Sequence, residues 1–164
     1  MSKEQTKDLL KFLKPFGDDT IELVLWLRDF AWSLCPSANE LIYDNFNAVA
    51  VGWSPTEKAG HTVCSIAVFR TNKNIQFGFY WGSELSDPER ILLGKGNQYR
   101  YILVTDKMKF PKDYIKKLVN EAYANSLAKV KDHKEIINGH TIIKSVSDKK
   151  RSTKGKKTPE TRKK

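Results

Sequence analysis

Residues 85–101, LSDPERILLGKGNQYRY, are the part of the chain that most resembles a phosphate-binding loop. Two glycines flank a lysine, and an arginine follows four residues after the second glycine. A phosphate loop places its glycines before a helix whose free N–H groups face the anion, whereas these glycines lead into a predicted strand. Asp87 and Pro88 match an N-cap and a first helical residue. The segment therefore predicts a short helix over residues 88–93, closed by Gly94 as a left-handed cap.

Side chains that could act in acid–base or nucleophilic chemistry are few and scattered. His61, His133 and His140 fall in predicted turns or weakly patterned segments, and none stands beside an obvious nucleophile. Cys64 lies in an apolar strand, which predicts an inert core thiol, and Cys35 stands at a helix end. We therefore predict no catalytic residue, and we expect a protein that is not an enzyme and uses no cofactor.

Four acidic side chains could supply the oxygen ligands that hard metal ions prefer: Glu40, Asp44, Asp87 and Glu89. Because they are spread over two segments, they fit a solvated surface better, and no metal site is predicted from them. The sequence places no pair of carboxylates for acid–base work.

The alternation of side chains within two predicted strands separates bulky residues from small ones. In residues 47–53, valines and Trp53 share one face, while alanines and a glycine share the other. In residues 75–81, an isoleucine, phenylalanines and Trp81 share one face, while glutamine, glycine and Tyr80 share the other. The small-residue face can pack closely against a helix. Alternatively, it can form a shallow pocket walled by these aromatic side chains.

The segment YDNFNA precedes the first of these strands and supplies further candidates. Its two asparagines either cap turns through bonds from side chain to backbone, or line a binding site. Under the second interpretation, the candidate ligand-binding residues are Tyr43, Asn45, Asn47, Trp53, Tyr80, Trp81 and Arg100.

The elements that would position these residues follow from the spacing of apolar side chains. A helix around residues 9–13 is stopped by a proline and a glycine, and Asp18 or Asp19 offers an N-cap for the next helix. The expected elements are helices at 9–13, 20–34 and from Pro111 to about 126, with strands at 47–53, 62–70, 75–81 and 98–105. Residues 138–148 could add a turn and a strand. The order predicts a compact α+β domain with N-terminal helices, an antiparallel sheet of about four to five strands and a C-terminal helix.

The net charge of +10 is concentrated at the C-terminal end of the chain. Residues 1–143 hold 19 basic and 17 acidic side chains, whereas residues 144–164 hold 10 basic and 2 acidic ones. We therefore expect one folded domain at 1–143, with its core at about 20–126, and a basic, disordered tail at 144–164. The tail is either a solubilising segment or a sequence-independent nucleic-acid contact. The cations that would make such a contact are Lys149, Lys150, Arg151, Lys154, Lys156 and Lys157.

Several segments taken together resemble the YdhG-like family of small domains of unknown function. They are ELIYDNFNAVAVGWSPTEKAG, SIAVF and IQFGFYWGSELSDPERILLGKGNQYRYILV, within about residues 20–126. The most specific mark is an aromatic strand followed by Gly-Ser-Glu-Leu, Asp-Pro, Leu-Leu-x-Gly-x-Gly and an arginine in the next strand. The resemblance implies a compact α+β domain with an antiparallel sheet and flanking helices.

The resemblance implies little about activity. Some relatives are described as frataxin-like iron chaperones, which implies acidic surface residues, but NFNAVAVGW stands where many members carry a Trp-Gly-x-Pro segment. No catalytic residue carries over from the family.

The sequence thus predicts a non-enzymatic domain that binds a small ligand, a metal or a protein through its sheet and residues 82–100. The polar N-terminus and the absence of an apolar run of about 20 residues predict a cytoplasmic protein without a membrane partner.

Overall fold

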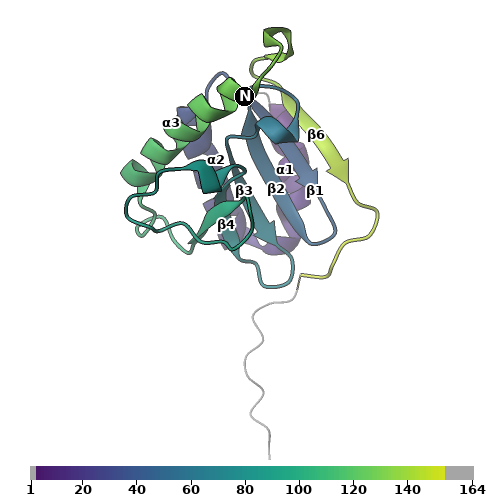
Figure 1. Ribbon diagram of the computed structural model, residues 1–164. Coiled ribbons are helices and arrows are strands. Elements are labelled where there is room, and N and C mark those ends of the chain that lie inside the picture. Colours follow the sequence, from purple (N-terminus) through teal and green to yellow (C-terminus); the bar gives the residue numbers. More distant parts are fainter. Residues whose placement is uncertain (1–2, 154–164) are drawn as a thin grey trace, which may run out of the picture.

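The computed structural model describes residues 3–153, in which helices lie against one face of a single β-sheet (Figure 1). The α-helices and strands, in chain order, are α1 (Lys3–Leu13), α2 (Asp18–Leu34), β1 (Asn39–Asp44), β2 (Ala48–Ser54), β3 (Cys64–Phe69), β4 (Ile75–Phe79), β5 (Arg100–Val104), α3 (Lys112–Lys129) and β6 (Thr141–Val146). Single turns of 3-10 helix lie between them, at η1 (Lys14–Phe16), η2 (Ala59–His61), η3 (Gly82–Glu84) and η4 (His133–Glu135). The predicted α+β class is confirmed.

The described residues form one mixed sheet of six strands, in the order β5-β4-β3-β2-β1-β6. Neighbouring strands are antiparallel from β5 to β1, and β6 runs parallel to β1 at the edge. The prediction of four to five antiparallel strands is therefore wrong in two respects. β1 was not predicted at all, and β6 joins the sheet in the parallel direction.

β1 escaped prediction because two of its side chains are acidic. The structure buries both Glu40 and Asp44 completely, so the prediction of a solvated acidic surface is wrong for them. Glu40 accepts hydrogen bonds from Nε of Arg28 at 2.5 Å and from Nη2 of Arg28 at 2.8 Å. Asp44 forms an ion pair with the equally buried Arg70. A buried charge is tolerated when it is paired in this way, and the pairs allow an acidic strand to lie inside the fold.

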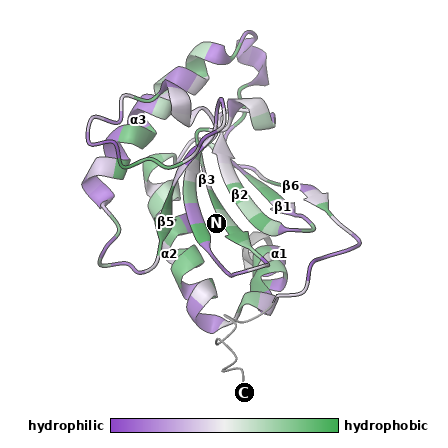
Figure 2. Cartoon of the chain, turned by 60° about the horizontal axis from the view of Figure 1, so that its bottom comes forward, coloured by the Kyte–Doolittle hydropathy of each residue, from purple (hydrophilic) through white to green (hydrophobic). Residues whose placement is uncertain are grey.

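The apolar core lies between the helices and one face of the sheet, here called the inner face. Figure 2 shows α1 and α2 on that side of the sheet and α3 beside them. Strand residues such as Val51, Ile66 and Phe77 are at most 1% exposed and pack with Leu27 of α2 and Leu118 of α3. The predicted helical periods are confirmed, because the same apolar residues that define them make this core.

The N-terminal caps of the helices differ slightly from expectation. Gly17 is the N-cap of α2 and gives no side-chain cap, so the prediction that Asp18 or Asp19 caps this helix is wrong. Both aspartates lie in the first turn instead, where their charge still favours the helix dipole. In α3, Pro111 is the N-cap rather than the first helical residue.

The C-terminal part of the described chain runs along the edge of the sheet. Residues 144–146 complete β6, and residues 147–153 continue past the end of β1. Residues 154–164, which include Lys154, Lys156 and Lys157, lie outside the described residues. None of the helices between residues 3 and 153 combines the length and the apolar character that crossing a membrane requires.

Candidate functional site

The face of the sheet opposite the helices is the candidate site. The strand register places Tyr43 opposite Ala50, Ala50 opposite Ala67, and Ala67 opposite Gln76, so these side chains form one row across four strands. All four are only partly buried, and in Figure 1 α1 and α2 lie behind the sheet, on the side away from this surface. The surface, called the outer face below, comprises Tyr43, Ala48, Ala50, Ser65, Ala67, Gln76, Tyr99 and Tyr101.

The predicted separation of small from bulky side chains is confirmed, but the helices pack against the bulky face. Bulky aliphatic and aromatic side chains interdigitate with the helices, whereas the alanines leave the backbone of β2 and β3 open to close approach. The interpretation that a helix covers the small-residue face is therefore wrong for the described residues.

Tyr99 borders the outer face on the side of β4. Its hydroxyl donates a hydrogen bond to Oε1 of Gln76 at 3.1 Å, and its ring stacks on Tyr101 with a centroid distance of 5.7 Å. The ring lies against Gly78, where an added Cβ would come within 2.5 Å of Cε2 and Cζ. Burial raises the pKa of Tyr99 to about 12. Tyr99 is not among the residues predicted from the sequence. Its i, i+2 spacing from Tyr101 indicates that the two share a face, but its place over Gly78 depends on the pairing of β4 with β5.

Tyr43 borders the outer face on the side of β1. Its hydroxyl is buried and has no hydrogen-bond partner among the described residues. Burial, and secondarily the neighbouring Tyr80, raise the pKa of Tyr43. A buried hydroxyl without a partner costs about 1–3 kcal/mol, and a molecule bound on the outer face can satisfy it only where the ring turns toward that molecule.

Trp81 stands at the rim of the outer face rather than on it. Its ring packs edge-on against Tyr80 at 5.4 Å, and its Nε1 donates to the carbonyl of Gly60 in η2 at 2.8 Å. The ammonium of Lys129 lies over the same ring at 4.9 Å. These contacts fix Trp81 as a link between the β4 end, η2 and the end of α3.

The structure places two predicted site residues on the inner face. Trp53 is fully buried and packs edge-on against Trp32 of α2, with ring centroids 6.1 Å apart. Arg100 pairs with Phe79 in the sheet, so it shares the inward side of that residue. Its guanidinium folds back and donates to the carbonyls of Gly96 at 2.6 Å and Tyr99 at 2.8 Å. Neither side chain lies beside Tyr43 on the outer face.

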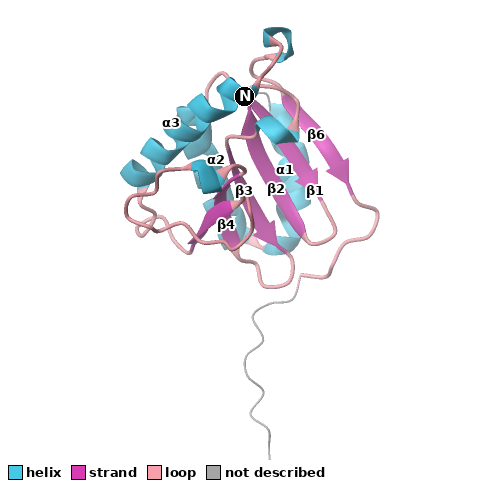
Figure 3. Cartoon of the chain, in the orientation of Figure 1, coloured by secondary structure: helices cyan, strands magenta, loops and turns pink. Residues whose placement is uncertain are grey.

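The connection from β4 to β5 contains no helix at residues 88–93, so that prediction is wrong (Figure 3). The Asp87 carboxylate caps a tighter turn, accepting from the N–H groups of Ile91 at 3.2 Å and Leu92 at 3.1 Å. The hydroxyl of Tyr114 in α3 also donates to Asp87, at 2.6 Å. Positive φ angles at Asp87 (36°) and Arg90 (54°) are incompatible with a helix there.

The glycines of this connection behave differently from each other. Gly94 has a φ of 127°, a backbone angle that favours glycine, but no helix ends there, so the predicted left-handed helix cap is wrong. Gly96 is not among the residues with positive φ. The carbonyl of Gly96 accepts a hydrogen bond from the guanidinium of Arg100.

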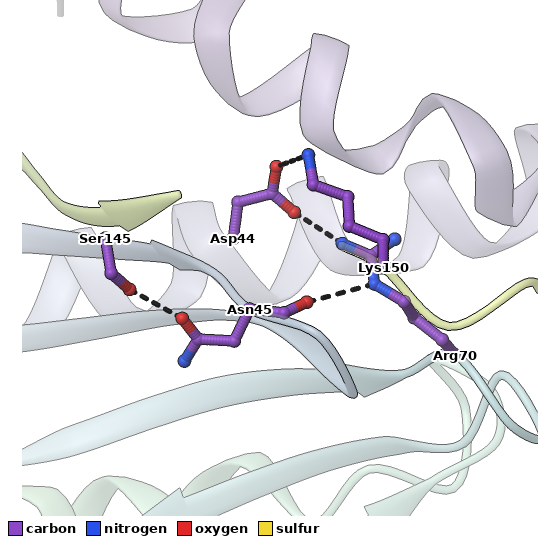
Figure 4. A network of polar contacts seen from close by, with 5 residues as sticks. All are labelled: Asp44, Asn45, Arg70, Ser145 and Lys150. Atoms are coloured by element: carbon purple, nitrogen blue, oxygen red, sulfur yellow. Dashed lines mark hydrogen bonds and ion pairs between the residues drawn. The ribbon is translucent and has the colours of Figure 1, made fainter. Parts of the chain in front are cut away.

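Asn45 and Asn47 lie in the turn between β1 and β2. Figure 4 shows the contacts of Asn45. The backbone N–H of Asn45 donates to the carbonyl of Ala48 at 2.9 Å, and its side-chain oxygen accepts from the Ser145 hydroxyl at 2.6 Å. The carbonyl of Asn47 accepts from the N–H of Arg70 at 2.8 Å. These contacts are backbone–backbone or side chain–side chain, and among the described residues no hydrogen bond runs from either asparagine side chain to the backbone, so the capping interpretation gains no support.

The basic residues of the described tail segment differ in their contacts. Lys149 is exposed, whereas Lys150 forms an ion pair with the buried Asp44 (Figure 4). The guanidinium of Arg151 lies over the ring of Phe46 at 5.4 Å. Two of the predicted nucleic-acid contacts are thus already engaged within the chain.

The described residues contain no group of three or more His, Cys, Asp or Glu side chains that could hold a metal ion. The two cysteines, Cys35 and Cys64, are both buried and free. A hydrogen bond with Cys35, together with burial, raises the pKa of Cys64 well above its usual value. The predicted core position of Cys64 is confirmed, and that its thiol is inert stays a prediction. Its proximity to Cys35 was not foreseeable from their spacing.

One cavity of about 400 Å³ lies away from the predicted residues, between the start of α2 and the β3–β4 hairpin. Its lining includes Leu23, Ile75 and Leu103 together with Asn72 and Asn74. It is mostly apolar with a few polar groups, and it is a second location at which a small molecule could bind.

Comparisons of this chain with protein-family models, with curated proteins and with solved structures find no match.

Proposed function

We propose that this chain is a YdhG-like domain that binds a small, planar ligand on its outer face and catalyses no reaction. The observation that carries the proposal is the unpacked centre of the sheet. Partly exposed small side chains at Ala50, Ser65 and Ala67 lie there between the aromatic rings of Tyr43 and Tyr99. The resemblance over residues 20–126 supports the family assignment.

The chemistry of the outer face favours an aromatic or similarly flat molecule with one hydrogen-bonding group. Alanine and serine side chains let such a ring approach the strand backbone, and tyrosine rings offer edge and face contacts. The unpartnered hydroxyl of Tyr43 supplies a donor or acceptor for the polar group. Burying about 150 Å² of apolar surface would contribute about 4 kcal/mol, which corresponds to a Kd near 1 mM.

The proposal that the domain catalyses no reaction is supported by the contacts of its acidic and thiol side chains, several of which are taken up by ion pairs, a turn or the core. Glu40 and Asp44 are bound by arginines, Asp87 holds a turn, and Cys64 is a buried thiol with a raised pKa. As part of the same proposal, the protein works in the cytoplasm, where both of its free thiols stay reduced.

The test is a two-dimensional NMR titration of the full chain with indole, phenol, nicotinamide and adenine, each to several millimolar. We expect at least one of them to shift amides of residues 48–50, 65–67 and 76–80. The variant Ala67→Leu fills the centre of the face and should abolish these shifts. Its matched control, Ala124→Leu, changes an exposed alanine on α3 and should leave them intact.

Tyr43→Phe separates binding from folding. Removing an unpartnered buried hydroxyl should leave the free protein as stable as the wild type or more stable. The same change should weaken a ligand that bonds to this hydroxyl by about 2–12-fold, which corresponds to about 0.5–1.5 kcal/mol. Shifts confined to Leu23, Ile75 and Leu103 would place binding in the cavity near α2 and would refute the outer-face proposal.

A further inference from the structure

We propose that the edge of β1 that β6 covers, together with Asp44, Phe46 and Phe12, is a recognition surface for an extended basic peptide. In the structure this surface is occupied by the chain's own residues 141–151, here called the strap. The partner it fits is a segment of another protein that adds as a strand and then presents adjacent lysine and arginine side chains. This surface is separate from the outer face and does not depend on a ligand there.

The strap is recognised first through its backbone. β6 adds to β1 in parallel, with Glu40 opposite Thr141 and Asp44 opposite Val146. Beyond the strand, the N–H of Ser147 donates to the carbonyl of Asp44, and the N–H of Arg151 donates to the carbonyl of Phe46, both at 2.8 Å. Such addition of an extended segment to a sheet edge is a common mode of peptide recognition, in which main-chain bonds supply affinity.

Two side chains at the end of the strap then find specific partners. The Lys150 ammonium forms an ion pair with the Asp44 carboxylate and lies over the Phe12 ring, 5.7 Å from its centroid. Figure 4 shows Lys150 and Arg70 approaching the two oxygens of this carboxylate from different directions. An acid and an aromatic ring around one ammonium group form a site for a basic side chain.

Arg151 occupies the adjacent position on the same surface. Its guanidinium lies over the ring of Phe46, which is 42% exposed and therefore available to a cation from outside. The surface thus binds two successive basic side chains, the first through the buried carboxylate of Asp44 and the second through the exposed ring of Phe46.

The strap is held in a way that allows exchange. It lies at the edge of the sheet, and among the helices and strands β1 is its main neighbour. Its large apolar side chains contribute little to the core, since Ile143 is 42% exposed and Val146 is 53% exposed. Backbone bonds hold it, together with side-chain hydrogen bonds from Thr141, Lys144 and Ser145 and the contacts of Lys150 and Arg151. Its attachment to the same chain gives it a high effective concentration. A peptide in trans must compete with this internal occupant.

Fluorescence anisotropy with a labelled peptide of residues 139–153 tests the proposal on the full chain. Wild-type protein should bind the peptide weakly, because its own strap occupies the surface. Lys150→Ala weakens the strap and leaves the surface intact, so it should bind the same peptide at least tenfold more tightly. A peptide with alanine at positions 150 and 151 should bind both proteins poorly. Circular dichroism verifies that the variant is folded.

Arg151→Ala provides a second route if Lys150→Ala does not fold. It removes only a contact with an exposed ring, and it should tighten peptide binding by several-fold. Three results would each overturn the proposal: equal peptide affinity of the wild type and the variants, equal affinity for the basic and the alanine-substituted peptide, or no measurable binding to a folded variant.

Discussion

Gly78→Ala is the substitution that most directly probes the boundary of the outer face. Tyr99 lies so close to Gly78 that a Cβ there would fall within 2.5 Å of two atoms of its ring. The ring must then move away, which breaks the hydrogen bond from Tyr99 to Gln76 and exposes the phenol to water. We expect the pKa of Tyr99 to fall from about 12 towards its ordinary value of 10.0. Overpacking should also cost about 1–3 kcal/mol of stability at neutral pH.

The raised pKa of Tyr99 also predicts how stability depends on pH. Because the pKa is higher in the folded protein than in the unfolded chain, the contribution is complete below pH 10 and is lost as pH rises through about 12. With pKa values of 10.0 and about 12, ionisation of this tyrosine removes about 1.4 kcal/mol of stability at pH 11. The Gly78→Ala variant should not lose this 1.4 kcal/mol, because its Tyr99 pKa is close to that of the unfolded chain. The difference in unfolding free energy between the wild type and the variant should therefore be smaller at pH 11 than at pH 7 by about 1.4 kcal/mol.

The assay combines a titration of tyrosine ¹³Cζ resonances with urea unfolding at the two pH values. Tyr99→Phe assigns the resonance, and Gly60→Ala is the control, since a Cβ at Gly60 meets nothing within 4 Å. A Tyr99 pKa near 10 in the wild-type protein would refute the reasoning. So would a Tyr99 pKa that stays near 12 in Gly78→Ala.

Three further predictions concern the contacts that support the sheet. Glu40→Gln should destabilise the protein by about 3–5 kcal/mol in urea unfolding, because it leaves Arg28 buried without a counter-charge; a loss below about 1 kcal/mol would contradict this. Burial, and after it the hydrogen bond to the Asp87 carboxylate, raise the pKa of Tyr114, so Asp87→Asn should lower that pKa. An unchanged Tyr114 pKa in an NMR titration would count against the contact. Cys64, whose thiol is buried and has a raised pKa, should react with Ellman's reagent only after urea unfolds the chain, and rapid reaction of the native protein would show that the thiol is accessible.

The elements that the sequence predicts well are those whose apolar residues face one shared core. The helix expected at 20–34 corresponds to Asp18–Leu34, and the strand expected at 75–81 corresponds to Ile75–Phe79. In both, the apolar residues recur at the period of the element, so local pattern and tertiary packing agree. The two-residue differences at the start of the helix and the end of the strand come from caps and turns.

β1 and the β4–β5 connection could not be predicted, for opposite reasons. In β1, the acidic side chains of Glu40 and Asp44 make the segment look solvent-exposed in the sequence. The arginines that pair with them in the interior come from other parts of the chain. In the connection, the local sequence favours a helix, but tertiary contacts stabilise a turn instead. The Asp87 carboxylate accepts hydrogen bonds both from Tyr114 of α3 and from the backbone of its own turn. Both outcomes depend on residues far away in the sequence.

The candidate site was predicted only in part for a similar reason. Strand alternation correctly indicated a small-residue face, but it could not show on which side the helices lie. Trp53 therefore looked like a wall of the site, although its ring belongs to the core against Trp32. Tyr99 was missed because its position over Gly78 depends on the pairing of β4 with β5.

The most direct test of ligand binding on the outer face is a comparison of Ala67→Leu with Ala124→Leu in the fragment titration. The proposal predicts shifts at residues 48–50, 65–67 and 76–80 in the wild type and in Ala124→Leu, and their loss in Ala67→Leu. Retention of the same shifts and the same affinity in Ala67→Leu would contradict it.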